Sequence, residues 1–397
     1  MTGNVQKVQS SDEGASKPKY FRSPLKWPGG KFRDLGRLMP LFPKDIDRYI
    51  DPFVGSGTVA ANVAIQKLAS SMVLGDIDSD LIRFLQMRGE GPTFERFQSL
   101  LIGLESARHD AALAPVNEAN FPAMFMVSCL RCLRHIDNSL RRNDVVKTIV
   151  EKERERRISA MAKMIDLGSK PEENYPRTAI FAVIYYLVRD AYNDGERNMA
   201  DPAVRVATWF VLRELAHGGI MRYSRETKFN TAYGGMSYNT KSMLWKLPDI
   251  ARIGKLLREN NAEIRRSDFM TLLDDAAPGA NDFIFLDPPY EQAFHGNVAE
   301  GQDISVPPDQ SFYPYVLSKE PMSSHSDLFR WLRQNGSRTR WMLVERQTPW
   351  IMDQINTLIE SDARILVQTY DRKYAANIKG RNNRSTTHVI VTNYPTP

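Results

Sequence analysis

The stretch Phe283-Ile284-Phe285-Leu286-Asp287-Pro288-Pro289-Tyr290 decides the fold class of this chain. Its four apolar residues are typical of a buried strand in a parallel sheet. A strand cannot continue through Pro288-Pro289, because proline has no N–H for the ladder. Asp287 and Tyr290 therefore follow the carboxyl end of a strand, where open α/β sheets bind their ligands. Taken alone, the stretch fits equally well a strand that ends in a Pro-Pro turn with a surface aspartate.

Two further strand ends lie upstream. Arg48-Tyr49-Ile50 leads into Asp51-Pro52-Phe53-Val54-Gly55-Ser56-Gly57, and an alanine-rich helical pattern follows at 59–68. A strand, a glycine turn and a helix bring backbone close to a ligand. Met72-Val73-Leu74 ends at Gly75-Asp76, and Asp76 follows Gly55 by 76 − 55 = 21 residues. Nucleotide-binding α/β domains place an acid for ribose hydroxyls near that spacing, so we interpret Asp76 as a ligand group rather than a helix cap.

A glycine-containing turn precedes these strands at Lys26-Trp27-Pro28-Gly29-Gly30-Lys31. The glycines allow a tight backbone path, which Trp27 and Lys31 flank with a flat surface and a cation. The turn is not a Walker A loop, because Phe32 stands where that motif needs Ser or Thr. An ordinary Pro-Gly turn before a helix is the alternative.

The domain pattern combines sheet and helix segments. Strand patterns resume at 262–266, which ends at Ser267-Asp268, and continue at 340–344, 364–370 and 387–393. Helical spacing dominates the intervening region. We therefore expect an α/β catalytic domain at 20–90 and 255–397, a largely helical insertion at 91–254 and a disordered polar tail at 1–19.

Cys129-x-x-Cys132-x-x-His135 in the helical region invites a zinc interpretation. No second pair of ligands follows at a usable spacing, and apolar residues surround the cysteines. The pattern therefore favours a core helix face, and we predict no metal site.

Two basic segments are candidates for nucleic-acid contact. A predicted β-hairpin at 222–235 carries Arg222, Tyr223, Arg225, Lys228, Asn230 and Tyr233, and a loop between the last two strands carries Lys379, Arg381 and Arg384. Arginine and aromatic side chains on a ribbon suit base reading and stacking, and loop cations suit phosphates. A plain surface hairpin is the alternative.

The composition of the chain limits the class of protein to which it can belong. The 397 residues are 42% hydrophobic and 25% charged, which fits a globular protein, and the net charge of +6 weakly suggests a polyanionic partner. The absence of a long apolar run and the presence of only two cysteines predict a cytoplasmic protein without a membrane span.

Four ordered motifs together are far more specific than any one of them. Lys-Trp-Pro-Gly-Gly-Lys, Asp-Pro-Phe-Val-Gly-Ser-Gly, Gly-Asp-Ile-Asp and Asp-Pro-Pro-Tyr occur in that order, and the chain resembles the Dam-type (class alpha) family of DNA adenine-N6 methyltransferases. The resemblance covers most of the chain except the tail and much of residues 90–200. It implies a Rossmann-like methyltransferase sheet, S-adenosylmethionine as cofactor, double-stranded DNA as partner, base flipping and a bacterial or phage setting such as restriction-modification.

The resemblance also implies residue roles. Cofactor contacts are expected from Trp27, Lys31, Asp51, Phe53, Gly55, Gly57, Asp76, Ser267, Asp268 and Asp287, and the catalytic residues would be Asp287, Pro288, Pro289 and Tyr290. Arg222 matches a guanine-contacting arginine of the family. Ala232 replaces a common proline, and His217-Gly218 replaces an aromatic-Asn pair, so the DNA sequence recognised stays open, as do the oligomeric state, monomer or dimer, and any accompanying restriction enzyme.

These residue types suit methylation of an exocyclic adenine amine, whose lone pair is delocalised into the ring. The Asp287 carboxylate and the Pro288 carbonyl can each accept one amine hydrogen and direct the lone pair toward a methyl donor. Tyr290 can stack on a base that has left the duplex. Positioning supplies much of the rate enhancement, and no metal is required.

Three alternatives remain. An N4-cytosine methyltransferase more often has Ser before Pro-Pro-Tyr, and protein glutamine methylation generally uses Asn there, so Asp287 counts against both. The third is a catalytically silent DNA-binding protein that retains the fold, which the intact motifs disfavour.

Overall fold

The computed structural model describes residues 6–7, 20–168, 174–219, 221–224, 226–239, 241–290, 324–373 and 385–396. The chain forms two compact units. The sheet unit comprises residues 1–23, 27–85 and 255–397, and the helical unit comprises residues 24–26 and 86–254. Each has its own buried core.

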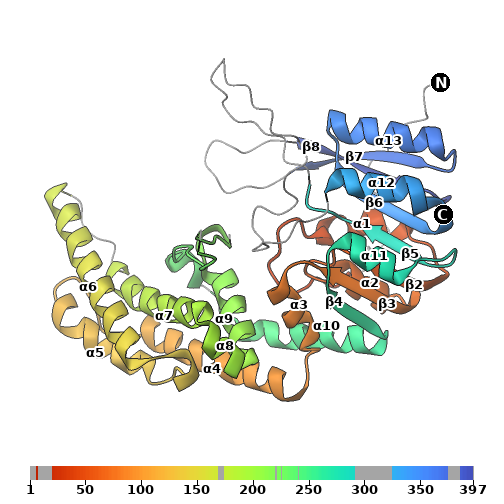
Figure 1. The fold of residues 1–397 in the computed structure, drawn as a ribbon. Coiled ribbons are helices and arrows are strands. Elements are labelled where there is room, and N and C mark those ends of the chain that lie inside the picture. The colour runs from red at the N-terminus through yellow and green to blue at the C-terminus, as the bar shows by residue number, and fades with distance from the viewer. Residues whose placement is uncertain are drawn as a thin grey trace, which may run out of the picture. The chain divides into compact units, whose positions relative to one another are not determined.

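The sheet unit is built on one sheet, which has eight strands among the described residues, in the order β1-β7-β8-β6-β5-β2-β3-β4 (Figure 1). The strands are β1 Gln6–Lys7, β2 Ile46–Asp51, β3 Ala69–Asp76, β4 Ala262–Arg266, β5 Phe283–Leu286, β6 Arg340–Arg346, β7 Leu366–Lys373 and β8 Ser385–Thr392. All neighbours are parallel except β8, which runs antiparallel to both β6 and β7. This arrangement confirms the predicted α/β class and the Rossmann-like methyltransferase fold.

The strand order reverses between β2 and β5. From β2 the chain adds β3 and β4 on one side, whereas β5 and β6 lie on the other side. The carboxyl ends of β2 and β5, at Asp51 and Leu286, therefore flank the switch point at which open α/β sheets bind ligands.

Strand β5 is buried on both faces, which explains its uninterrupted apolar run. Ile284 and Leu286 join the core formed with helices α11 (Phe269–Ala276), α12 (His325–Asn335) and α13 (Pro349–Ser361). Phe283 and Phe285 point to the other face, where their rings lie 4.8 and 5.5 Å from that of Phe42. The remaining helices of this unit are α1 Leu35–Leu38, α2 Thr58–Ile65 and α3 Ser79–Gln86, of which α3 ends at the boundary.

The helical unit contains α4 Gly91–Ala112, α5 Phe121–Leu133, α6 Asn143–Asp166, α7 Tyr175–Asn193, α8 Gly195–Ala200 and α9 Pro202–Leu215, and α10 (Leu247–Glu259) continues into the sheet unit. Its core combines aliphatic and aromatic side chains, and the rings of Phe97 on α4 and Phe210 on α9 lie 5.7 Å apart. Cys129 and Cys132 on α5 are free and buried in this core, as the apolar pattern around them predicts.

The polar segment at 1–19 contains one described element. This is β1, in which Gln6 and Lys7 pair in parallel with Gln368 and Thr369 of β7. The rest of the segment lies outside the described residues.

Candidate active site at the carboxyl edge of the sheet

Asp287 directly follows β5, and its carboxylate pairs with the ammonium group of Lys31. The Lys31 side chain is 1% exposed and also donates to the Gly29 carbonyl at 3.2 Å. Burial raises the pKa of the Asp287 carboxyl, and the Lys31 ammonium opposes that rise. Lys31 is the first residue of a 3-10 turn, and the Gly29-Gly30 turn lies directly before it. This turn therefore positions the lysine side chain at the end of β5.

Tyr290 lies over the same ammonium. The Lys31 Nζ is 4.8 Å from the centre of the Tyr290 ring, within the range of a cation–π contact. Pro288 is buried, whereas Pro289 and Tyr290 are half-buried. The ion pair and the ring contact therefore join the Lys-Trp-Pro-Gly-Gly-Lys and Asp-Pro-Pro-Tyr motifs, which lie far apart in sequence.

The glycine turn after β2 is shaped for close approach. Gly55 and Gly57 both adopt left-handed backbone conformations, with φ of 48° and 70°, and Gly57 precedes the first residue of α2. A Cβ at Gly55 would lie 3.0 Å from Cδ1 and Nε1 of the Trp27 indole. The indole thus lies directly on the turn, and a side chain at Gly55 would push it away.

Two buried carboxylates border this turn. Asp51 accepts from the Tyr49 hydroxyl at 2.9 Å and from the Phe53 N–H at 3.1 Å. Asp76 accepts from the N–H groups of Gly55 at 3.2 Å and Asp78 at 3.0 Å. Both carboxylates therefore brace the turns around them, a local role that spacing alone does not show.

Burial sets the protonation of both groups. It raises the pKa of Asp51 to about 8, with the nearby Asp287 and Asp76 charges adding to the rise. It raises the pKa of Asp76 to about 7, with Asp78 contributing in the same direction. Three acids thus share one edge of the sheet, where a positively charged ligand would stabilise their ionised forms.

The remaining predicted cofactor residues lie at or near the same edge. The Ser267 N–H donates to the Asp76 carbonyl at 3.1 Å, and the Asp268 side chain caps α11 by accepting from the Met270 N–H at 3.0 Å. The Phe53 ring is buried 5.3 Å from that of Phe269. In the structure, Ser267 thus bonds the end of β3, Asp268 caps α11 and Phe53 packs in the core.

The predicted hairpin lies in the helical unit, where Tyr223 pairs with Phe229 and Ala216 with Tyr233 in antiparallel bridges. Its two arms also bond through the backbone, from the Asn230 N–H to the Arg222 carbonyl at 3.0 Å. Helix α7 supports the segment from outside. The Asn193 side chain bonds both the N–H and the carbonyl of Phe229, and the Tyr185 hydroxyl donates to the Thr231 carbonyl at 2.9 Å.

The residues predicted to contact DNA fall into an exposed group and a half-buried group. Arg222, Lys228 and Asn230 are exposed. Tyr223 instead pairs hydroxyls with Tyr192 at 3.1 Å, and the Tyr233 ring lies 5.5 Å from that of Tyr185, so both are half-buried packing residues. Arg225, Lys379, Arg381 and Arg384 lie outside the described residues.

Sequence reasoning missed a second layer behind Lys31. The Arg372 guanidinium on β7 lies 2.8 Å from the buried Asp34 carboxylate and donates to the Gly30 carbonyl at 3.4 Å. His388 on β8 is fully buried, and its ring centre lies 5.0 Å from that of Tyr290. The sequence signal for His388 is its place directly before the apolar residues Val389-Ile390-Val391 of the predicted last strand.

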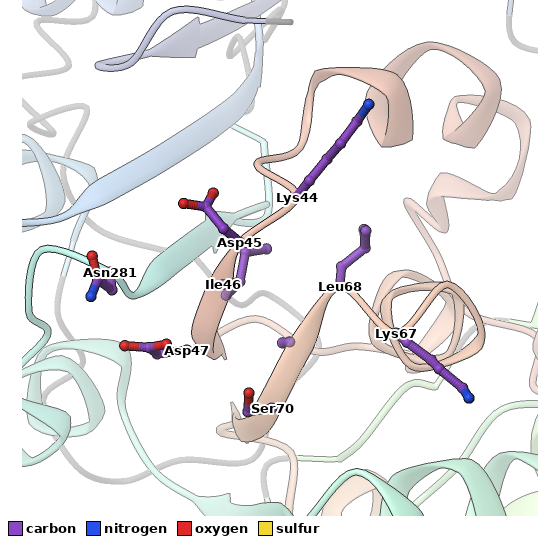
Figure 2. Close-up of a pocket in the computed structure, with 9 residues that line it drawn as sticks. Lys44, Asp45, Ile46, Asp47, Lys67, Leu68, Ser70 and Asn281 are labelled. Atoms are coloured by element: carbon purple, nitrogen blue, oxygen red, sulfur yellow. The ribbon is translucent and has the colours of Figure 1, made fainter.

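A pocket of 410 Å³ lies at the opposite edge, where β2 and β3 begin and Asn281 precedes β5 (Figure 2). Lys44 and Lys67 lie on its rim with Asp45 and Asp47. None of the predicted site residues lines it. Within the described ranges, no group of three His, Cys, Asp or Glu side chains is placed to hold a metal, and no helix is long and apolar enough to cross a membrane.

Comparison with known proteins identifies the family. The family described as D12 class N6 adenine-specific DNA methyltransferase matches residues 27–119 and 146–303. The chain is 24% identical over 272 residues to the Type II methyltransferase M.MjaIII of Methanocaldococcus jannaschii, covering 67% of this chain and 68% of that protein.

Two further relatives match over smaller shares of their length. The DNA N-6-adenine-methyltransferase of Escherichia phage P1 is 24% identical over 68% of this chain and 24% of its own length. The DNA adenine methylase of Haemophilus influenzae is 39% identical over 18% of this chain and 24% of its own length. The family match spans both the strand-end motifs and much of the helical unit, and the chain belongs to the D12 class of N6 adenine-specific DNA methyltransferases.

Proposed function

We propose that the chain uses S-adenosylmethionine to methylate N6 of an adenine flipped out of double-stranded DNA. The sheet unit would hold the cofactor and perform the chemistry, and the helical unit would carry target recognition. The observation that carries this proposal is the convergence of Asp287, Tyr290 and Lys31 beside the glycine turn, in a chain of an adenine-specific family.

The donor set at the sheet edge fits this cofactor. Trp27 offers a flat indole beside the Gly55 turn, and Asp51 and Asp76 are buried acids with raised pKa values. A ligand that carries a sulfonium and an ammonium group would stabilise the ionised carboxylates. Trp27, Gly55 and Gly57 would contact its rings, and Asp51 and Asp76 would face its polar and charged groups.

When bound, S-adenosylmethionine supplies a methyl group on a positively charged sulfur. Asp287 is the acceptor for one amine hydrogen of adenine, and the Pro288 carbonyl, fixed by its ring, is the acceptor for the other. These two contacts draw the nitrogen lone pair out of the purine ring. The Lys31 ammonium lowers the pKa of Asp287 against the effect of burial and so favours its ionised form, which is the stronger acceptor.

Tyr290 would hold the plane of the flipped base by stacking. Its half-buried ring lies against the Lys31 ammonium, which helps to fix its orientation. Exposed Arg222, Lys228 and Asn230 in the helical unit would contact the duplex. Half-buried Tyr223 and Tyr233 would support this segment through their contacts with Tyr192 and Tyr185.

The decisive experiment incubates the pure protein with methyl-labelled S-adenosylmethionine and DNAs of varied sequence, followed by identification of the modified nucleoside. We expect N6-methyladenine. N4-methylcytosine, or no transfer to any DNA, would overturn the proposal. The Asp287→Ala variant is the matched control and should bind DNA but not methylate it.

A further inference from the structure

A row of three rings, those of Tyr290, His388 and Tyr370, lies behind the catalytic motif, within the sheet unit. The His388 ring centre is 5.0 Å from that of Tyr290 at an interplanar angle of 68°, and 5.3 Å from that of Tyr370 at 28°. His388 is fully buried and Tyr370 is 5% exposed. Tyr290 is thus the outermost ring of a row whose inner members belong to β8 and β7.

Cations close both ends of this row. The Lys31 Nζ lies 4.8 Å from the centre of the Tyr290 ring, and the Arg37 Cζ lies 4.4 Å from that of Tyr370. Since Lys31 also pairs with Asp287, the orientation of the tyrosine ring and that of the carboxylate depend on the same ammonium. A change in the row would therefore reach both groups of the motif.

The backbone of His388 is fixed by strand pairing on both sides. It lies in β8 between two ladder partners, Arg346 on β6 and Tyr370 on β7. Burial and the nearby Lys31 and Arg372 charges lower the pKa of His388 to about 4, so the ring is neutral at neutral pH. A neutral ring can lie against Tyr290 beside Lys31 without repelling the ammonium, which a protonated imidazole would do.

We propose that His388 is a positioning residue for methyl transfer. Its ring, fixed between two strands and backed by Tyr370, sets the plane of Tyr290 and hence of the base stacked on it. This rests on the proposed function, in which Tyr290 stacks on the flipped adenine. Edge-to-face and stacked ring pairs have preferred geometries, so the row defines an orientation and does more than fill space.

A plain packing role would behave differently, and Tyr394 provides the comparison. It is also a buried aromatic residue of the sheet unit, with its ring edge-on to Phe283 at 5.8 Å and its hydroxyl donating to the Leu41 carbonyl at 3.0 Å. These contacts lie at the start of β5, away from Asp287. Loss of Tyr394 therefore tests general destabilisation without touching the row.

The experiment compares His388→Leu, His388→Phe and Tyr394→Leu in the full chain. Single-turnover rates on a duplex that the wild-type protein converts to N6-methyladenine report the chemical step. Calorimetry reports cofactor affinity, and 2-aminopurine in place of the target adenine reports stacking, because stacking quenches its fluorescence. The wild-type product separates failure of this inference from failure of the proposed function.

We expect His388→Leu to lower the single-turnover rate about 10-fold, since a misplacement of about 1 Å can cost about 100-fold. Cofactor affinity should stay within about two-fold of wild type, 2-aminopurine should become brighter, and His388→Phe should restore most of the rate. Tyr394→Leu should lower the melting temperature and leave the rate per folded molecule unchanged.

Two results would overturn the proposal. One is a His388→Leu rate within two-fold of wild type, and the other is an equal loss of rate in Tyr394→Leu. If His388→Leu is insoluble, Tyr370→Leu removes the backing ring instead and is judged by the same measurements. A wild-type rate in that variant would equally exclude the row from positioning.

Discussion

At Asp287, burial and an adjacent ammonium act on one carboxylate in opposite directions. Burial raises the pKa of the group and Lys31 lowers it, although the net direction remains upward. The ionised carboxylate is the stronger acceptor for an amine hydrogen, so methylation should fall as the pH drops through this pKa. Removal of Lys31 should raise the pKa further, because an opposite charge at this range lowers an aspartate pKa by about 1–3 units.

We therefore expect Lys31→Met to move the acid limb of the pH–rate profile upward by about one to three units. Single-turnover rates measured from pH 5 to pH 9 at saturating cofactor would test this. Lys26→Met is the matched control, because Lys26 lies in the same stretch but pairs with Glu214 in the helical unit. An unshifted acid limb in Lys31→Met would show that another group keeps Asp287 ionised.

Asp51 and Asp76 should make the binding of the cofactor, rather than the rate of methyl transfer, depend on pH. Their pKa values of about 8 and about 7 lie above the ordinary aspartate range, so both gain charge as the pH rises from 6 to 8. A cationic ligand binds the ionised form, and its affinity should rise across this window by up to about ten-fold per pH unit for each coupled group. S-adenosylhomocysteine shares the ammonium but lacks the sulfonium, so it isolates the effect of that charge.

The expected result is a ratio of S-adenosylmethionine to S-adenosylhomocysteine affinity that increases from pH 6 to pH 8, as measured by calorimetry. Asp51→Asn should flatten the rise, because the amide cannot ionise yet can still accept the Phe53 N–H. A ratio that does not change with pH would show that the sulfonium is not near these carboxylates.

At the scale of elements, the sequence predicts a strand or a turn where neighbouring residues alone determine it. The apolar run 283–286 and the prolines after it place Asp287 at a strand end, and the β5 strand has those bounds. Pairing between distant segments has no such local signal. The contact of Lys31 with Asp287 spans 256 residues of sequence, and Arg372 reaches Asp34 from the other end of the chain.

The hairpin illustrates a different limit. The aromatic and basic residues of 222–235 predict a ribbon, and Tyr223 pairs with Phe229 in an antiparallel bridge. The bonds from Asn193 and Tyr185 that tie this backbone to α7 join residues 36 to 46 positions apart, so no local pattern predicts them.

The exposed cations of this segment lead to a prediction about specificity. Arg222→Ala should weaken discrimination at one base pair of the target by about 1–3 kcal/mol, because an arginine that bonds a guanine edge reads sequence. Methylation of a randomised duplex library, followed by sequencing of the modified molecules, would measure it. Lys228→Ala is the control and should lower the affinity for all sequences alike. If both variants lose affinity without relaxing any position, Arg222 contacts phosphate.

At the scale of the whole molecule, two units with separate cores should respond separately to a ligand of one of them. The proposed cofactor residues, Trp27 to Gly57, Asp76 and Ser267 to Asp287, all belong to the sheet unit. Ligand at 100 times its dissociation constant stabilises the folded form by about 2.7 kcal/mol. For a domain of about 150–250 residues, each 1 kcal/mol corresponds to about 2–4 °C.

Differential scanning calorimetry of the full chain should therefore show two transitions, of which saturating S-adenosylhomocysteine raises one by roughly 5–10 °C. The other should stay in place and should move down in Phe97→Leu, because Phe97 is fully buried against Phe210 in the helical unit. Asp51→Asn should reduce the ligand-induced rise without affecting the second transition. A single transition that shifts as a whole with ligand would mean that the two cores unfold as one cooperative unit, and the assignment of cofactor binding to the sheet unit alone would lose its thermodynamic support.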